Sequence, residues 1–190
     1  MRLHLHFVAF LLAGLCTISA GVRRNDDTPD GHILAADTVE KAKAALAEGA
    51  NINIKDEVNG QTPLMRATLH GWNSLVTYLL DQGADVNIGE KDGYTPAHGA
   101  GFQGRTKILE ILRDHKVDIF EKSKKDGFTP YHRACWGREE RHTETIRFLL
   151  AAGVNVNLKG GPDQRTCFQM TPNKKTKALL IEYGAGNEEL

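Results

Sequence analysis

The sequence predicts an all-α repeat solenoid of about five units, two of which are terminal caps. The first observation is a Gly-x-Thr-Pro motif whose threonines, Thr62, Thr95 and Thr129, lie 33 and 34 residues apart. The second is an apolar segment with helical spacing after each motif, namely LVTYLL, ILEIL and IRFLL. A period of this size is typical of units that stack side by side and bury one another's apolar faces.

Each unit is expected to contain two short helices. The threonine of each Thr-Pro pair is suited to cap the first helix, and the proline fits the first helical turn, where its missing N–H has no intrahelical partner. The apolar segment forms the second helix. Gly83 and Gly153 follow that helix and fit the left-handed residue that commonly ends one.

These motifs resemble the ankyrin repeat, which has a period of 33 residues and a signature centred on Thr-Pro-Leu-His. The resemblance implies a β-turn finger, an inner helix, an outer helix and a return loop in each unit. We predict units at residues 31–56, 57–89, 90–123, 124–160 and 161–190. The first, taken from residue 31, has no Thr-Pro pair and is interpreted as a cap, and the last is short and rich in lysine, as a solvated cap requires.

Two units depart from the pattern. The fourth carries three extra residues within GREERHTET, between its helices. The third places Gly99 and Gly101 inside a helix, where each glycine costs about 1 kcal/mol relative to alanine. It also places Arg113 where the second unit has Leu80, and Lys116 at the left-handed helix end. We therefore expect the third unit to open first.

The N-terminal segment is predicted to be a secretory signal peptide over residues 1–20, followed by a linker over 21–30. Arg2 precedes an apolar stretch of about fourteen residues, and small residues follow it. The chain is therefore expected in the secretory pathway or outside the cell. The alternative is an uncleaved membrane anchor with the repeats in the cytosol, because Arg23 and Arg24 follow the apolar stretch.

Composition and motifs argue against several classes of partner. Lys plus Arg and Asp plus Glu both number 24, so no basic footprint for nucleic acid is expected. The segment HGAGFQG has the spacing of a nucleotide-binding glycine turn, but Gly99 and Gly101 are predicted to lie inside a helix rather than at its start. No metal or cofactor signature is present, and no small-molecule cofactor is expected.

His132 and Cys135 lie three residues apart and are the one candidate for a thiol enzyme. The alternative, which we favour, is that no residue is catalytic. In the family that the repeats resemble, His98 and His132 occupy a position whose histidine makes structural hydrogen bonds. Cys135 is expected to be a small buried apolar residue. A disulfide with Cys167 is disfavoured, because the two residues are expected at different heights on neighbouring units.

Function is expected to be non-enzymatic binding of an unidentified protein on the concave face of the array. Fingertip and inner-helix positions predict exposed aromatic residues on this face, and such residues often anchor an interface. A regulator or inhibitor of an enzyme partner is the alternative. The predicted contact residues are Tyr94, Phe128, Phe102, Trp136, Leu69, His70 and Gln103.

Overall fold

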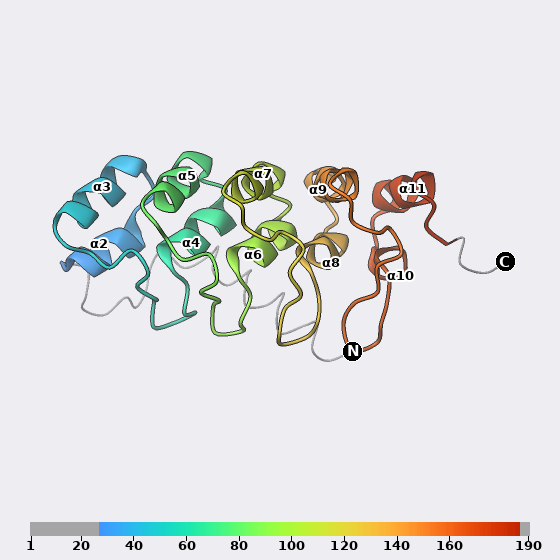
Figure 1. Ribbon diagram of the computed structural model, residues 1–190, viewed down its shortest axis with the longest axis horizontal. Coiled ribbons are helices and arrows are strands. Elements are labelled where there is room, and N and C mark those ends of the chain that lie inside the picture. Colours follow the sequence, from blue (N-terminus) through green and yellow to red (C-terminus); the bar gives the residue numbers. More distant parts are fainter. Residues whose placement is uncertain (1–26, 187–190) are drawn as a thin grey trace.

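A computed structural model describes residues 27–186 as an elongated row of helix pairs (Figure 1). The inner helices form one layer, the outer helices a second, and finger loops project from the inner layer on the side away from the outer helices (Figure 1). The inner helices are α2 (Pro29–Ala35), α4 (Pro63–His70), α6 (Pro96–Gln103), α8 (Pro130–Cys135) and α10 (Cys167–Met170). The outer helices are α3 (Val39–Ala47), α5 (Asn73–Asp81), α7 (Thr106–Asp114), α9 (Glu140–Ala151) and α11 (Lys174–Glu182). The predicted all-α solenoid of five helix pairs is confirmed.

The predicted signal peptide lies outside the described residues, as does most of the predicted linker. Helix α2 begins at Pro29, so the domain boundary predicted at residue 31 falls inside this helix. Thr28 caps the helix, and its side chain accepts a hydrogen bond from the Gly31 amide at 3.1 Å. The first unit therefore has the Thr-Pro pair that we expected it to lack, 34 residues before Thr62. No helix between residues 27 and 186 has the length and apolar character needed to cross a membrane.

Helices α2, α4, α6 and α8 begin at a Thr-Pro pair, and the threonine side chain caps α2, α4 and α8. The Thr95 side chain makes no such bond at the start of α6 and bonds to His98 instead. The Thr62 side chain accepts a hydrogen bond from the Met65 amide at 3.2 Å, and Thr129 does the same for His132 at 3.4 Å. The fingers between units are tight turns closed by backbone hydrogen bonds. One example joins the Ser123 amide to the Phe128 carbonyl at 2.8 Å. The β-turn fingers that the family resemblance implies are present.

The core lies between the two helical layers. Small residues on the inner helices, such as Ala67, Ala100 and Ala134, let the outer helices pack closely. The apolar segments that predicted the outer helices supply the larger buried side chains, which include Leu75, Val76, Leu79, Ile108, Leu109, Leu112, Ile146, Leu149 and Leu180. Each unit therefore buries its apolar surface mainly against its neighbours, as in other solenoids.

The extra residues of the fourth unit extend its outer helix. Helix α9 has 12 residues, whereas α5 and α7 have nine each. His142 lies in the added turn, and its Nε2 donates to the Phe102 carbonyl at 3.0 Å. The insertion therefore links the fourth unit to the inner helix of the third.

Close packing requires a glycine at position 101. The prediction of a weak third unit considered only the low helix propensity of this glycine. A β-carbon at Gly101 would overlap with the backbone carbonyl of Pro130, because α6 and α8 come into close contact there. The predicted left-handed residue is present, since Lys116 has a φ of 65°. The glycine thus weakens its own helix but permits the contact with the next unit, so its helix propensity alone does not identify the third unit as the weakest.

Replacing Gly101 with Ala is therefore expected to destabilise the protein by about 1–3 kcal/mol, since a rigid backbone blocks the new methyl group. Gly99→Ala is the matched control in the same helix. Its β-carbon would lie 3.1 Å from Met65 Sδ and 3.2 Å from Leu69 Cδ2, and both are ends of flexible side chains. Urea unfolding should place Gly99→Ala within about 1 kcal/mol of the native protein. Equal effects of the two substitutions would contradict this account.

Candidate functional site

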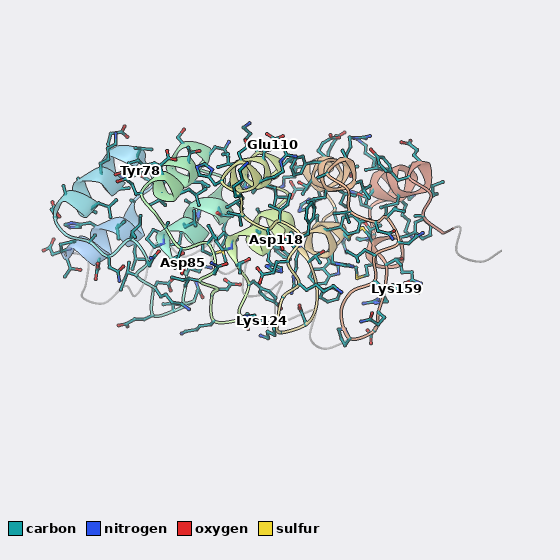
Figure 2. The ribbon with its side chains drawn as sticks, in the orientation of Figure 1. Tyr78, Asp85, Glu110, Asp118, Lys124 and Lys159 are labelled. Atoms are coloured by element: carbon teal, nitrogen blue, oxygen red, sulfur yellow. A yellow bond between two sulfur atoms is a disulfide. The ribbon has the colours of Figure 1, made fainter. Side chains whose placement is uncertain are left out.

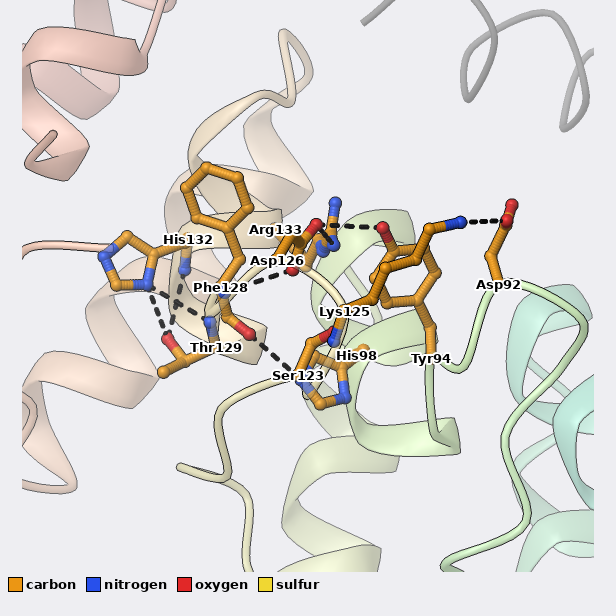
Figure 3. Close-up of polar contacts among 10 residues, drawn as sticks. All are labelled: Asp92, Tyr94, His98, Ser123, Lys125, Asp126, Phe128, Thr129, His132 and Arg133. Carbon is orange, nitrogen blue, oxygen red and sulfur yellow. Dashed lines mark hydrogen bonds and ion pairs between the residues drawn. The ribbon is translucent and has the colours of Figure 1, made fainter. Parts of the chain in front are cut away.

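The face made by the inner helices and the fingers, called the inner face below, carries all the predicted contact residues. Tyr94 and Phe128 are each only 6% exposed, so the expectation that they face solvent is wrong. The Arg133 guanidinium covers the ring of Tyr94 (Figure 3). The next finger covers Phe128, because a β-carbon on Gly161 would overlap with its ring. Both fingertip aromatics are therefore packed between units.

Arg133 occupies the space that these aromatic side chains share. It is 2% exposed and forms an ion pair with Asp126 (Figure 3). Its Cζ atom lies 3.9 Å from the centroid of the Tyr94 ring, 4.7 Å from that of Trp136 and 5.3 Å from that of Phe128. Attraction to the ring faces and to a carboxylate thus stabilises the buried cation. We call these five residues the arginine cluster.

The electrostatics of the cluster keep its charges fixed near neutral pH. The Tyr94 hydroxyl donates to Asp126 Oδ2 at 2.9 Å. Burial raises the pKa of Tyr94 to about 12, and the hydrogen bond to Asp126 adds to this effect. Burial by itself raises the pKa of Asp126, but Arg133 and the hydrogen bonds to the carboxylate outweigh it and leave that pKa below its ordinary value. The cluster therefore contains a neutral phenol, a carboxylate and a guanidinium.

Leu69, Phe102 and Trp136 are the predicted contact residues that remain partly exposed and apolar. They occupy the same repeat position, seven residues after each threonine, on α4, on α6 and directly after α8. Gln103 is partly exposed and His70 is exposed, and the His70 ring stacks on Trp72 at 4.5 Å between centroids. A cavity of about 10 Å³, room for one water molecule, lies between α4 and α6. It is lined by Met65, Leu69, Glu90, Tyr94, His98, Gly99, Phe102 and Arg133.

His98 and His132 each bridge two fingers. The Nδ1 atoms lie 2.8 Å from the hydroxyls of Thr95 and Thr129, respectively. Their Nε2 atoms donate to backbone carbonyls in the next finger, that of Phe128 at 3.1 Å and that of Leu158 at 3.0 Å. Burial lowers the pKa of each histidine to about 4, so both rings are neutral. These are the structural hydrogen bonds that the family resemblance implies.

The repeat geometry agrees with comparisons to known families. The family described as "Ankyrin repeats (3 copies)" matches residues 32–123, and "Ankyrin repeat" matches residues 126–161. The chain belongs to the ankyrin repeat family. Thr-Pro capped inner helices, finger turns and histidine bridges are the physical features behind this match.

Several large proteins contain segments similar to this ankyrin array. Alpha-latroinsectotoxin-Lt1a of Latrodectus tredecimguttatus is 33% identical over 141 residues, which is 72% of this chain and 10% of the toxin. Inactive serine/threonine-protein kinase TEX14 of Bos taurus is 32% identical over 152 residues, or 78% of this chain and 10% of that protein. Ankyrin repeat and SAM domain-containing protein 6 of Rattus norvegicus is 54% identical over 84 residues, or 44% and 9%. The chain thus spans about a tenth of these relatives.

Cys135 and Cys167 form a disulfide with their Cα atoms 5.4 Å apart. The expectation against this bond is wrong. The end of one inner helix lies against the start of the next, so the two residues face each other at the same height. Both cysteines are fully buried. The His132 ring nitrogens bond to Thr129 and Leu158, so this arrangement does not provide the free thiol and neighbouring base that the thiol-enzyme alternative requires.

The glycine motif HGAGFQG is part of an ordinary repeat. Gly99 and Gly101 are buried inside α6, and Gly104 is the left-handed residue that ends this helix with a φ of 65°. A phosphate needs free amides at a helix start, and the motif lies at the other end of this helix. Between residues 27 and 186 no three histidine, cysteine or acidic side chains are grouped as metal ligands would be.

Arg133 and Asp126 are the residues that sequence reasoning missed. Arg133 lies four residues after Thr129, at the repeat position of Arg66 and Gly99. The repeat register gives this position of Arg133 within its unit, and the sequence shows aromatic residues around it. The register does not reveal that Asp126, Tyr94 and Arg133 converge, because Tyr94 lies in the finger before α6, whereas Asp126 lies in the finger before α8 and Arg133 on α8 itself.

Because the bridging histidines stay neutral in the folded chain, the protein is expected to lose stability as the pH drops from about 6.5 to 4. In the unfolded chain these rings bind a proton near pH 6.5, but in the folded chain they stay neutral down to about pH 4. The unfolded state therefore binds more protons in this window, and acid favours unfolding. Urea unfolding should show that replacing both His98 and His132 with Gln reduces the stability lost between pH 7 and pH 5 by roughly 1–2 kcal/mol per histidine.

Glutamine suits this test because Gln169 already occupies the same capping position in the last unit. His115→Gln is a control of opposite sign. The Ile111 carbonyl and Asp81 raise the pKa of His115, so this histidine stabilises the folded state in acid. Its removal should steepen the loss of stability in acid. A pH dependence unchanged by the double substitution would contradict the assignment.

Proposed function

We propose that this protein binds another protein through the inner face and catalyses no reaction of its own. Ankyrin repeats are in general protein-interaction modules, and the chain belongs to that family. Support for this face comes from Leu69, Phe102 and Trp136, which are partly exposed apolar residues at one repeat position in three successive units. Such a row provides contact area for a partner segment that lies across several units.

The polar residues beside this row suit the rim of an interface. Gln103 and His70 lie next to Phe102 and Leu69 at the ends of their inner helices. Rim residues of this kind provide hydrogen bonds and exclude water from the apolar centre. Tyr94 and Phe128 contribute indirectly, because their packing in the arginine cluster fixes the position of Trp136.

We also propose that the chain is made in an oxidising compartment, in keeping with the predicted signal peptide. The Cys135–Cys167 disulfide supports this proposal, because disulfides persist in secreted proteins and are rare in the cytosol. Cys16 lies in the predicted leader, so the mature chain would contain these two cysteines alone.

Substitutions on the inner face should separate binding from folding. A partner captured by the mature chain should bind at least roughly 5-fold more weakly when Leu69 or Phe102 is changed to Ala, with little change in Tm. Trp136→Ala should weaken binding as well, but it should also lower Tm, because this ring packs against Arg133 and Phe128. Tyr78→Ala is the matched aromatic control on outer helix α5 (Figure 2) and should leave binding intact. Affinity that is unchanged by all three substitutions, or lost equally with Tyr78→Ala, would place the interface elsewhere.

The proposal that the chain is made in an oxidising compartment predicts where the mature chain begins and how many free thiols it has. Protein purified from a eukaryotic secretory host should begin at Gly21, after cleavage behind Ala20. Unfolded without reductant it should show no free thiol, and after reduction it should show two. Edman sequencing and thiol titration give these results. An intact leader together with three free thiols before reduction, those of Cys16, Cys135 and Cys167, would refute this proposal.

A further inference from the structure

The Cys135–Cys167 disulfide replaces a contact that packing alone makes between the preceding units. Cys167 follows Thr166 at the first residue of α10, where Pro130 begins α8. Cys135 lies six residues after its threonine, as Gly101 does. Gly101 and Pro130 are in close backbone contact, whereas Cys135 and Cys167 are joined covalently. The last unit is therefore attached differently from the unit before it.

The last unit has a shorter inner helix and fewer large buried side chains than the three units before it. Its inner helix α10 has four residues, whereas α4 and α6 have eight each. Its large buried aliphatic side chains are Leu179 and Leu180, and on the same helix α11 Ile181 is 60% exposed. The direct polar contacts include the Thr143 and Thr176 hydroxyls, whose oxygens lie 2.8 Å apart. A unit that buries so little apolar surface depends more than its neighbours on a covalent link.

The finger before α10 covers part of the fourth unit. Gly160 lies against the His132 imidazole, where a β-carbon would be 2.6 Å from Cε1. Gly161 lies over the Phe128 ring in the same way. Phe128 in turn contacts Trp136 edge to face, with the ring centroids 5.1 Å apart. Movement of the last unit would therefore uncover two residues that border the row of apolar contacts.

We propose that the Cys135–Cys167 disulfide is a redox latch that holds the last unit closed over Phe128 and His132, and that reduction by a dithiol opens this unit. Reduction would thereby control the accessibility of the inner face. Only the effect on partner binding rests on the proposed function; the opening itself does not. In the oxidised protein Phe128 is covered and the arginine cluster is complete. In the reduced protein the C-terminal end of the inner face becomes mobile and exposes an aromatic ring.

The redox step is ordinary thiol–disulfide exchange. A thiolate of the dithiol attacks one cysteine sulfur, the disulfide bond breaks and a mixed disulfide forms. The second thiol of the reagent then displaces the bound cysteine. The reagent leaves as a cyclic disulfide, and its two protons end on Cys135 and Cys167. Since both cysteines are fully buried, the exchange waits for a transient opening of the last unit.

Hydrogen exchange of the mature chain, with and without a dithiol, tests the latch. The bond closes a loop with a sequence separation of 32 residues, so its loss should increase the open population on the order of 100-fold. Amides of α10 and α11 should therefore exchange on the order of 100-fold faster after reduction, while those of α4 and α5 keep their rates. Unchanged exchange in α10 and α11, or equal acceleration along the whole array, would overturn the proposal.

A control variant keeps the result specific to the disulfide. The variant combines Cys135→Thr with Cys167→Pro. These substitutions introduce the residues found at the junction of the second and third units, where Thr68 corresponds to Cys135 and Pro96 to Cys167. Proline suits the first residue of α10 for the reason that it suits the other inner helices. Exchange in this variant should not respond to the dithiol. A response as large as that of the native chain would show that the reagent acts elsewhere and would overturn the latch.

A second readout follows the residue that the finger covers. Opening removes the burial that lowers the pKa of His132, so NMR titration should show this pKa moving up toward 6.5 after reduction. His98 is the internal reference, because its ring bonds to Thr95 and Phe128 rather than to the last finger. A His132 pKa that stays near 4 would overturn the proposal. Neither measurement uses a partner, so failure of the latch is distinct from failure of the proposed binding function.

Discussion

The contact between the end of one inner helix and the beginning of the next is the constraint on which this array depends. A unit of about 33 residues cannot bury its apolar face alone, so its position is set by its neighbours. Where α6 meets α8, the contact is close enough that Gly101 has no room for a side chain. Where α8 meets α10, the equivalent positions carry a disulfide. The close approach of successive inner helices is thus made possible by the smallest residue between α6 and α8 and is fixed by a covalent bond between α8 and α10.

The close contact between units also explains why the fingertip residues Tyr94 and Phe128 are buried. Tyr94 and Phe128 precede the Thr-Pro pairs, at positions that look exposed when one unit is considered alone. In the array the neighbouring unit supplies Arg133 and the next finger supplies Gly161, and these groups cover both rings. Aromatic area that resembles a binding surface in the sequence is used to join units. The apolar residues that stay partly exposed at one repeat position form a shorter row at Leu69, Phe102 and Trp136.

Buried polar groups give the array its alignment. His98 and His132 each join a helix cap in their own unit to a carbonyl in the next finger, and burial keeps both rings neutral. The arginine cluster joins the fingers before α6 and α8 to helix α8 through an ion pair and three ring faces. Apolar packing specifies this registration less strictly, because many slightly shifted arrangements bury similar area, whereas a buried polar group tolerates few.

The sequence by itself determined the fold class and the two rows of helices, and the resemblance to the ankyrin family implied the structural role of the two histidines. The helices repeat, and each follows from local chemistry: a threonine cap, a proline in the first turn and apolar residues at helical spacing. Thr28 and Pro29 form the same pair, but Asp26 stands where a glycine precedes each of the other three pairs. The interpretation of the glycine motif as part of a helix was also available from the register.

Only the tertiary structure decided which residues are exposed, which are linked and which are needed for close contact. The burial of Tyr94, the pairing of Cys135 with Cys167 and the packing role of Gly101 all depend on the side chains of an adjacent unit. Periodicity gives the position of a residue within its own unit. It does not give the distance across the junction, since that distance results from how two particular surfaces pack together.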